Sequence, residues 1–117
     1  MEVKKAIYER RSIREFTDQK ISREILEDLV EAGAQAPNGR GFHEWKFTVI
    51  QAPELISELA GLIAKTQNRD PKTYDFYGPN ALILVSDNIS DTNWLANCSC
   101  ALQNIFLRAH DLGLGSD

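Results

Sequence analysis

Apolar residues recur at helical spacing in the first third of the chain, after a short start of mixed charge. Residues 2–10 are typical of a short helix, and residues 11–21 of an extended or turning segment. Ser22 is a good N-cap, and the apolar positions that follow it are Ile25, Leu26, Leu29 and Val30. The pattern therefore predicts a helix from Ser22 to about Ala36, where Pro37 stops it.

Two stretches have the character of strands, and a third helix lies between them. Residues 46–50 (KFTVI) are rich in β-branched and aromatic residues, which predicts a strand. Residues 81–85 (ALILV) form a continuous apolar run, which predicts a strand covered on both faces. Pro53 suits the first turn of the helix between them, whose apolar face is Leu55, Ile56, Leu59, Leu62 and Ile63. Residues 66–79 are polar, contain two prolines and are predicted to be a loop.

The last helix is predicted to begin at a cap formed by Asp91 or Thr92 and to end near Gly113 and Gly115. Its apolar stripe is Leu95, Cys98, Leu102, Ile105, Ala109 and Leu112. This stripe fits a buried helix or a helix–helix seam, and plain core packing is the simpler interpretation. The order of elements predicts a single domain over residues 1–117, of α+β or α/β layered class.

Composition excludes several classes of protein. Of the 117 residues, 43% are hydrophobic and 26% are charged, which is typical of a globular domain. The formal net charge of −4 argues against general nucleic-acid binding. No apolar run has the length of a signal peptide core or a membrane span. We therefore expect a cytoplasmic protein with no membrane partner.

The cysteines indicate neither a disulfide nor a metal site. Cys98 and Cys100 lie two apart on one predicted helix, where residues do not face each other. Together with the distant His43 and His110 they do not make a zinc pattern. Both are interpreted as small buried residues without a redox role.

Positive charge is concentrated at the N-terminus. Residues 1–23 carry seven Lys and Arg against four acids, a net charge of +3, so the remainder carries −7. Within them, residues 10–14 (RRSIR) combine three guanidinium groups with one hydroxyl, a set that matches phosphate oxygens. In an extended segment Arg10, Ser12 and Arg14 would line one side and Arg11 the other. The pattern predicts an anion site, and a solvated group of surface arginines is the alternative.

A second candidate segment lies between a helix and a strand, where layered α/β folds place ligands. Residues 36–45 (APNGRGFHEW) are rich in turn formers, and their glycines allow close approach of the backbone. Asn38, Arg40 and His43 supply hydrogen-bond donors. A structurally bonded His43 and a core Trp45 are the alternatives to a role in binding.

Taken in order, these segments resemble the nitroreductase family. Members of that family begin with a short helix, an R-R/H-S-x-R/K-x-F segment, a helix and an A-P-S-x-x-N-x-Q-P-W-x-F-x-V segment. The strand at residues 79–85, the last helix and the LGLGS turn at residues 112–116 also resemble the family's. The resemblance implies a nitroreductase-like fold, a homodimer with FMN at its interface, and electron transfer from NADH or NADPH to nitro compounds, quinones or related small-molecule acceptors.

The resemblance also assigns roles to residues. Arg10 and Ser12 would hold the FMN phosphate and ribityl chain, Arg11 would line the same channel, and Arg14 would lie near the flavin pyrimidine edge. The loop that would reach the partner's FMN contains Pro37, Asn38, Gly39, Gly41 and His43. Asn68 falls where the family has a polar residue near the flavin ring. Gly41, His43 and Glu44 replace the family's usual Asn, Gln and Pro, so the flavin contacts of this loop are expected to differ.

Family members continue several tens of residues past LGLGS, with a further strand and a basic residue that helps bind FMN phosphate. The resemblance therefore implies a domain truncated at its C-terminal end. Three hypotheses follow: an FMN-dependent oxidoreductase, a non-catalytic or degenerate FMN-binding fragment, and a helical interaction module that uses the stripe of residues 95–112.

Overall fold

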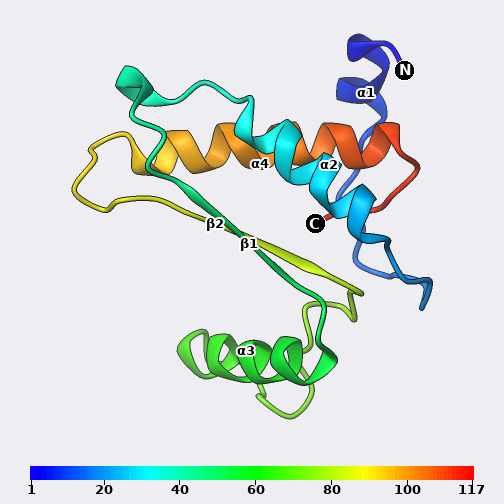
Figure 1. The fold of residues 1–117 in the computed structure, drawn as a ribbon. Helices are drawn as coiled ribbons and strands as arrows, with labels where there is room; N and C mark the ends of the chain where they lie inside the picture. Colours follow the sequence, from blue (N-terminus) through cyan, green and yellow to red (C-terminus); the bar gives the residue numbers. More distant parts are fainter.

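Four helices and two strands follow one another in the predicted order (Figure 1). The computed structural model describes all residues from 1 to 117. The elements are α1 (Val3–Glu9), α2 (Arg23–Ala34), the 3₁₀ turn η1 (Gly39–Gly41), β1 (Lys46–Ile50), α3 (Pro53–Thr66), β2 (Leu82–Ser86) and α4 (Trp94–Asp111). The Ser22 hydroxyl caps α2 by accepting a hydrogen bond from the Ile25 amide, as predicted. None of the helices combines the length and the apolar composition needed to cross a membrane.

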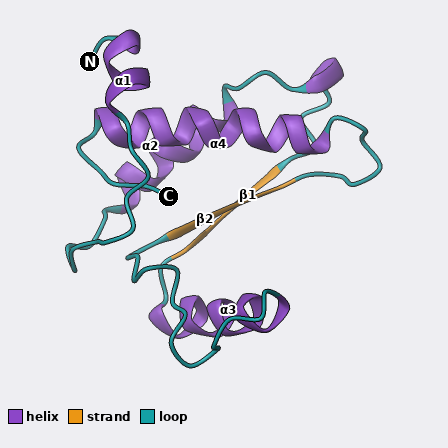
Figure 2. Cartoon of the chain, turned by 180° about the vertical axis from the view of Figure 1, so that it is seen from behind, coloured by secondary structure: helices purple, strands orange, loops and turns teal.

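The two strands form an antiparallel pair that separates two layers of helices. Their register runs from Lys46 opposite Ser86 to Ile50 opposite Leu82. In both views α2 and α4 lie on one side of the pair and α3 lies on the other (Figure 1, Figure 2). This arrangement confirms the predicted α+β class, with a small central sheet flanked by helices.

The core lies where α2 packs on α4 over one face of the strand pair. Leu26 and Leu29 of α2 cluster with Ile105 and Ala109 of α4, and each is at most 5% exposed. The strand residues that complete the cluster are Phe47, Ile83 and Val85. Gly33 permits the close approach of the helices, because a Cβ at this position would lie 2.9 Å from the Ile105 side chain.

The prediction that the second strand is covered on both faces is wrong. Leu84 points to the face opposite Ile83, and 38% of it is exposed. Its partner across the pair, Thr48, is exposed as well. Ile50, at the end of β1 that leads into α3, is buried. The helix on this side therefore covers one end of the strand pair and leaves the middle open.

The start of α4 also differs from the prediction. Its N-cap is Asn93 rather than Asp91 or Thr92, because the Asp91 carboxylate accepts a hydrogen bond from the Asn93 amide (2.8 Å) in a turn before the helix. The stripe is buried within the chain at Cys98, Ile105 and Ala109. Leu95, however, is 61% exposed, since the α2 residues of the core pack on the C-terminal half of α4.

The two cysteines differ in exposure. Both are free thiols, and Cys98 is buried as predicted. Burial, and secondarily the nearby Asp87 carboxylate, raise the pKa of the Cys98 thiol. Cys100 is exposed, so its prediction as a buried residue is wrong. Two positions along a helix turn the side chain by about 200°, which carries Cys100 off the buried face.

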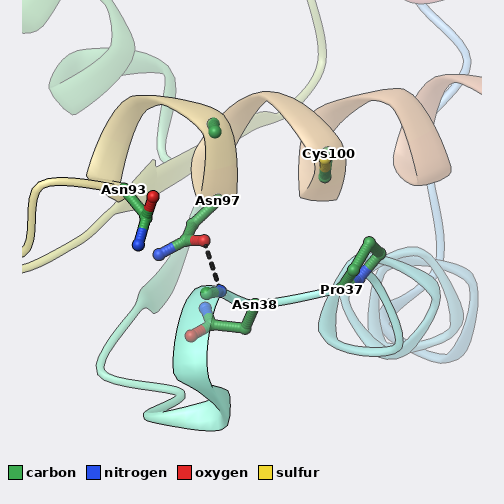
Figure 3. A pocket seen from close by; sticks show the side chains of 7 residues that line it. Pro37, Asn38, Asn93, Asn97 and Cys100 are labelled. Atoms are coloured by element: carbon green, nitrogen blue, oxygen red, sulfur yellow. Dashed lines mark hydrogen bonds between the residues drawn. The ribbon is translucent and has the colours of Figure 1, made fainter.

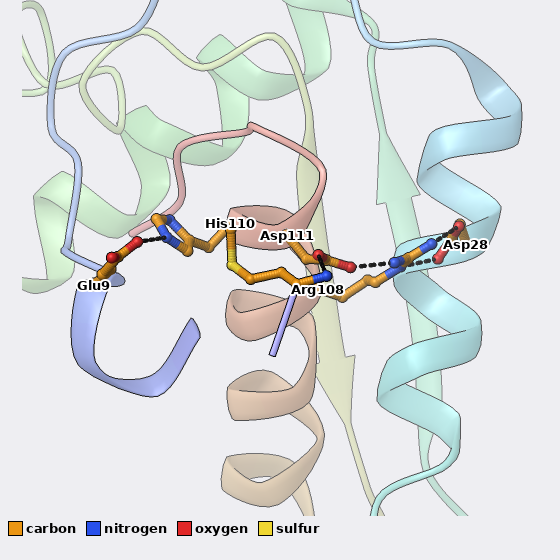
Figure 4. A network of polar contacts seen from close by, with 6 residues as sticks. Glu9, Asp28, Arg108, His110 and Asp111 are labelled. Atoms are coloured by element: carbon orange, nitrogen blue, oxygen red, sulfur yellow. Dashed lines mark hydrogen bonds and ion pairs between the residues drawn. The ribbon is translucent and has the colours of Figure 1, made fainter. Parts of the chain in front are cut away.

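A network of charged groups joins the C-terminal end of α4 to α1 and α2 (Figure 4). Arg108 binds both carboxylate oxygens of Asp28 on α2, at 2.7 and 2.8 Å, and also contacts Asp111. The N-terminal ammonium group lies 3.2 Å from Asp111. Glu9, the last residue of α1, lies 3.8 Å from the His110 ring. These contacts hold α1 against the end of α4, and the arginine-rich segment of residues 10–14 begins where α1 ends.

This network predicts a loss of stability in acid. Hydrogen bonds from Arg108 lower the pKa of Asp28, and the N-terminal ammonium, followed by Arg108, lowers the pKa of Asp111. A carboxyl group with a lower pKa in the folded chain adds stability above its ordinary pKa of 3.8. That stability is lost as the pH falls through the folded value, because the unfolded chain binds the proton first.

We expect Arg108→Met to weaken this dependence on pH. The fall in the urea midpoint between about pH 6 and about pH 3 should be smaller in the variant than in the parent. Arg23→Met is the matched control, since Arg23 pairs with Glu27 on an exposed face of α2, where 86% of the arginine side chain is exposed. An equal change in both variants would contradict a specific role for the Arg108 network.

Candidate functional site

The segment that contains Arg10–Arg14 leaves α1 and runs beside the C-terminal end of α4. The backbone of Arg10 is extended (φ −55°, ψ 140°), so the helix ends at Glu9. The guanidinium carbon of Arg10 lies 6.0 Å from the centre of the Phe106 ring on α4, within reach of a cation–π contact. Arg10 forms none of the ion pairs of the chain, so its charge is free to bind an anion.

The turn after α4 holds this segment extended. The Ile13 amide donates to the carbonyl of Ser116 (2.9 Å), and Ser12 pairs with Ser116 in an isolated parallel bridge. The absence of a side chain at Gly115 permits this contact, because a Cβ would lie 3.0 Å from the Ile13 side chain. Arg14 approaches the carboxylate of the last residue at 3.4 Å, yet 59% of its side chain stays exposed.

Arg11 points away from the other polar side chains of the segment. Its guanidinium donates to the carbonyls of Tyr8 (3.1 Å) and Arg10 (2.9 Å). These bonds satisfy carbonyl groups that the end of α1 would otherwise leave free. Arg10 and Arg14 instead contact α4 and the residues after it. The contacts therefore follow the alternation expected of an extended segment.

Residues 37–43 form a tight loop with several left-handed positions. The Asn38 side-chain oxygen accepts a hydrogen bond from the His43 amide (3.0 Å), and the Gly41 amide donates to the Asn38 carbonyl (2.9 Å). Arg40, Gly41 and His43 have φ values of 61°, 66° and 51°. The His43 ring packs edge-on against Trp45, with 5.8 Å between ring centres. The loop is therefore folded on itself, and His43 makes an aromatic contact.

The loop rests on the N-terminal end of α4 (Figure 3). The Gly39 amide donates to the side-chain oxygen of Asn97 on α4 (2.8 Å). Between loop and helix lies a shallow hollow of about 260 Å³, lined by Pro37, Asn38, Gly39, Asn93, Ala96, Asn97 and Cys100. The side-chain nitrogen of Asn38 is covered by protein but has no hydrogen-bond partner. Such a donor is the kind of group that an acceptor on a bound molecule would satisfy.

The two segments lie at opposite ends of α4. Arg10 contacts Phe106, whereas Gly39 contacts Asn97, nine residues earlier on the same helix. At the rise of an α-helix this separation is about 14 Å along the axis. Asn68 follows α3, on the other side of the strand pair. One copy of the chain therefore does not bring the predicted site residues together.

Comparison with known proteins identifies the family. The sequence pattern of the Nitroreductase family matches residues 7–116, which include both segments. The chain belongs to the nitroreductase family. The resemblance inferred from the sequence is therefore confirmed, and the chain is related to flavoprotein oxidoreductases that bind FMN.

Solved structures of nitroreductases share this fold. An FMN-bound nitroreductase from Bacteroides fragilis superposes with a TM-score of 0.87 at 31% identity, over 97% of this chain and 66% of its own. An FMN-dependent nitroreductase from Clostridium difficile gives a TM-score of 0.83 at 31% identity, over 93% of this chain and 55% of its own. A protein of Archaeoglobus fulgidus that carries the name NADH dehydrogenase/NAD(P)H nitroreductase is 31% identical over 96% of this chain and 63% of its own length. The chain thus spans less than two thirds of the length of each.

Asn97 of α4 and Asn93, the residue just before the helix, contact the loop of this nitroreductase-family chain and were not predicted from the sequence. Asn97 is only 3% exposed, although it precedes the apolar Cys98 in a helix whose other buried positions are small or apolar. The sequence carried no signal for this burial, because position 97 lies outside the predicted apolar stripe of the helix. Asn93 carried no signal either, since its contact with Gly39 joins residues that are far apart in the sequence.

We expect Gly39→Ala to displace the loop from α4. The added methyl group would lie 2.6–2.9 Å from three atoms of the Asn93 side chain, which is too close for any of them. Overpacking of this kind lowers the free energy of unfolding by about 1–3 kcal/mol. Urea unfolding of the variant measures the loss.

Asn93→Gly supplies the control for this contact. It removes all three crowding atoms, and Asn93 makes no capping hydrogen bond that would be lost. Glycine is also well tolerated at an N-cap. The double variant should therefore recover most of the stability lost by Gly39→Ala. A double variant as unstable as the sum of the two single changes would contradict the steric explanation.

Proposed function

We propose that this chain is an FMN-dependent oxidoreductase that passes electrons from NADH or NADPH to nitroaromatic, quinone or similar acceptors. The observation that supports the proposal is the placement of the two candidate segments at the two ends of α4. One segment offers Arg10, which has no carboxylate partner, and the largely exposed Arg14, and the other offers amide groups and glycines. Both segments lie within residues 7–116, the part of the chain that matches the family to which it belongs.

The first segment has the chemistry of a phosphate site. Arg10 has no carboxylate partner, and the Ser12 hydroxyl is exposed beside it. Guanidinium groups bind phosphate oxygens through charge-assisted hydrogen bonds, and a hydroxyl adds one more donor. We infer that these two residues hold the phosphate and ribityl chain. Arg11 lies in the same stretch and stabilises the end of α1 that precedes it.

The second segment completes the site from another copy of the chain. In a two-fold symmetric dimer each surface contacts the partner reciprocally, so opposite ends of α4 can meet across the axis. The loop of one copy would then lie beside the arginine segment of the other, and two equivalent sites would form. We therefore propose a homodimer with FMN at its interface. Asn68 remains a prediction from the resemblance alone, since it lies across the strand pair from both segments.

Bound FMN would supply the redox chemistry, by accepting a hydride from the nicotinamide and passing two electrons to the acceptor. The residues of the chain would bind and tune this group. Arg14 is a permanent cation with 59% of its side chain exposed. Near the pyrimidine edge it would stabilise the negative charge of the reduced state, because a fixed charge needs no rearrangement during the reaction.

The test combines the mass, the spectrum and the turnover of the purified protein. After incubation with FMN and gel filtration, we expect a dimer by light scattering that retains a flavin absorption spectrum. NADH or NADPH should bleach this spectrum, and a quinone or nitroarene should restore it. A dimer that keeps flavin but resists reduction would identify the non-catalytic flavin-binding alternative, and a protein that retains no FMN would refute the proposal.

A further inference from the structure

Asn97 connects three parts of the chain through one buried side chain. Its amide nitrogen donates to carboxylate oxygens of Asp87 (2.9 Å) and Asp91 (3.4 Å), in the segment between β2 and α4. Its amide oxygen accepts from the Gly39 amide at 2.8 Å (Figure 3). Only 3% of the residue is exposed. Both ends of the amide are therefore committed to partners inside the protein.

The charges around Asn97 decide which way the amide faces. Ionised carboxylates only accept hydrogen bonds, so the nitrogen must face Asp87 and Asp91 and the oxygen must face Gly39. Each carboxylate is itself held in place, because Asp87 accepts from the Asn88 amide and Asp91 accepts from the Asn93 amide, both at 2.8 Å. If the Asn97 amide rotated by half a turn, its oxygen would face the carboxylates of Asp87 and Asp91, and its nitrogen would face the N–H of Gly39. None of these contacts could be a hydrogen bond. The oxygen is thus presented to the loop in a fixed direction.

This contact is the only hydrogen bond that links residues 37–43 to another part of the chain. The other polar contacts of the loop, from the Gly41 amide and the His43 amide, return to Asn38. Without Asn97 the loop would keep its internal turn but lose its register on α4. The hollow beside Asn38 depends on that register, since Asn97 and Gly39 both line it.

We propose that Asn97 is a positioning residue, which sets the place of the 37–43 loop and so the half of the flavin site that this loop contributes to the partner copy. The second part of this inference, the contribution of the loop to the flavin site, rests on the proposed function. Its first part, the anchoring of the loop, concerns the chain alone. The two parts can be measured separately, so a failure of flavin binding would not obscure the anchoring.

The test compares Asn97→Leu with Asn104→Leu. Asn104 lies on the same helix and donates to the Ala32 carbonyl of α2 at 3.0 Å, so the control removes a similar side-chain bond that does not reach the loop. In Asn97→Leu, hydrogen exchange of a peptide covering residues 37–44 should be about tenfold faster, because the hydrogen bond from the Gly39 amide is lost. FMN should bind roughly tenfold more weakly, with an altered visible circular dichroism of the bound flavin. Asn104→Leu should leave the exchange of that peptide and the flavin signal unchanged.

A rescue pair tests the direction of the amide. Asn97→Asp keeps an acceptor for Gly39 but faces two carboxylates with a third, and it should free the loop. Adding Asp87→Asn returns a donor to the same contact and restores the original net charge, and it should slow the exchange of residues 37–44 and recover the flavin signal. Unchanged loop exchange in Asn97→Leu, or equal changes in Asn104→Leu, would overturn the inference. A parent chain that rejects FMN would refute the proposed function, while the exchange data would still decide whether Asn97 anchors the loop.

Discussion

Ile105→Ala is expected to lower the free energy of unfolding by about 2–5 kcal/mol, the usual loss for a large buried aliphatic side chain. Ile105 is 5% exposed and packs with Leu26 and Leu29, and its side chain also fills the space against Gly33. Gly33 has no side chain that could move into the cavity. Because small domains have only about 5–15 kcal/mol of total stability, urea unfolding should show a large shift of the midpoint.

Leu95→Ala is the matched control on the same helix. Leu95 is 61% exposed, and alanine is the best helix former, so the change should stay within about 0.5 kcal/mol. A loss at position 95 as large as that at position 105 would mean that the exposed first turn of α4 is buried in solution. A homodimer seam over this turn is the arrangement that would produce such a result.

Arg10→Ala and Arg14→Ala are expected to impair the flavin site in different ways. Loss of Arg10 should weaken FMN binding by about tenfold to a hundredfold, since hydrogen bonds between charged groups contribute about 1.5–3 kcal/mol. Loss of Arg14 should change FMN affinity less and should make the midpoint potential of the bound flavin more negative, because a cation no longer stabilises the reduced state. Fluorescence titration measures the first effect and spectroelectrochemistry the second.

Arg23→Ala controls for the removal of positive charge. Arg23 lies on α2 in an exposed pair with Glu27, away from both segments, and its loss should alter neither the affinity nor the potential. If Arg10→Ala and Arg14→Ala both bind FMN like the parent, the assignment of the phosphate site to this segment is wrong.

Most of the secondary structure could be predicted because its determinants act within a few residues. The Ser22 hydroxyl caps the helix that follows it, and Pro37 stands just after that helix ends. The strand at residues 46–50 was recognised from β-branched and aromatic side chains, which fit a pleated sheet. The helix cap, the helix end and the strand each depend on the local backbone and are nearly independent of the rest of the chain.

Exposure was predicted less well. Leu84 and Cys100 were predicted to be covered, and plain core packing, the simpler interpretation of the α4 stripe, would also have buried Leu95; all three are exposed in the single chain. An apolar residue in the sequence indicates that its position is compatible with a core. It does not indicate how far the neighbouring helix extends over that position. The packing of α2 on the second half of α4 leaves Leu95 exposed, the limited reach of α3 leaves Leu84 exposed, and Cys100 points away from the buried face of its helix.

The sequence by itself determined the family, since the order of the segments from Arg10 to the LGLGS turn is a property of the chain alone. It also indicated which side chains could bind an anion, because charge and hydrogen-bonding capacity belong to each residue type. The tertiary structure alone decided that the two segments lie at opposite ends of α4, about 14 Å apart along a rigid helix. It also revealed Asn97, because a hydrogen bond between residues 58 positions apart depends on how the helices pack and leaves no trace in local spacing.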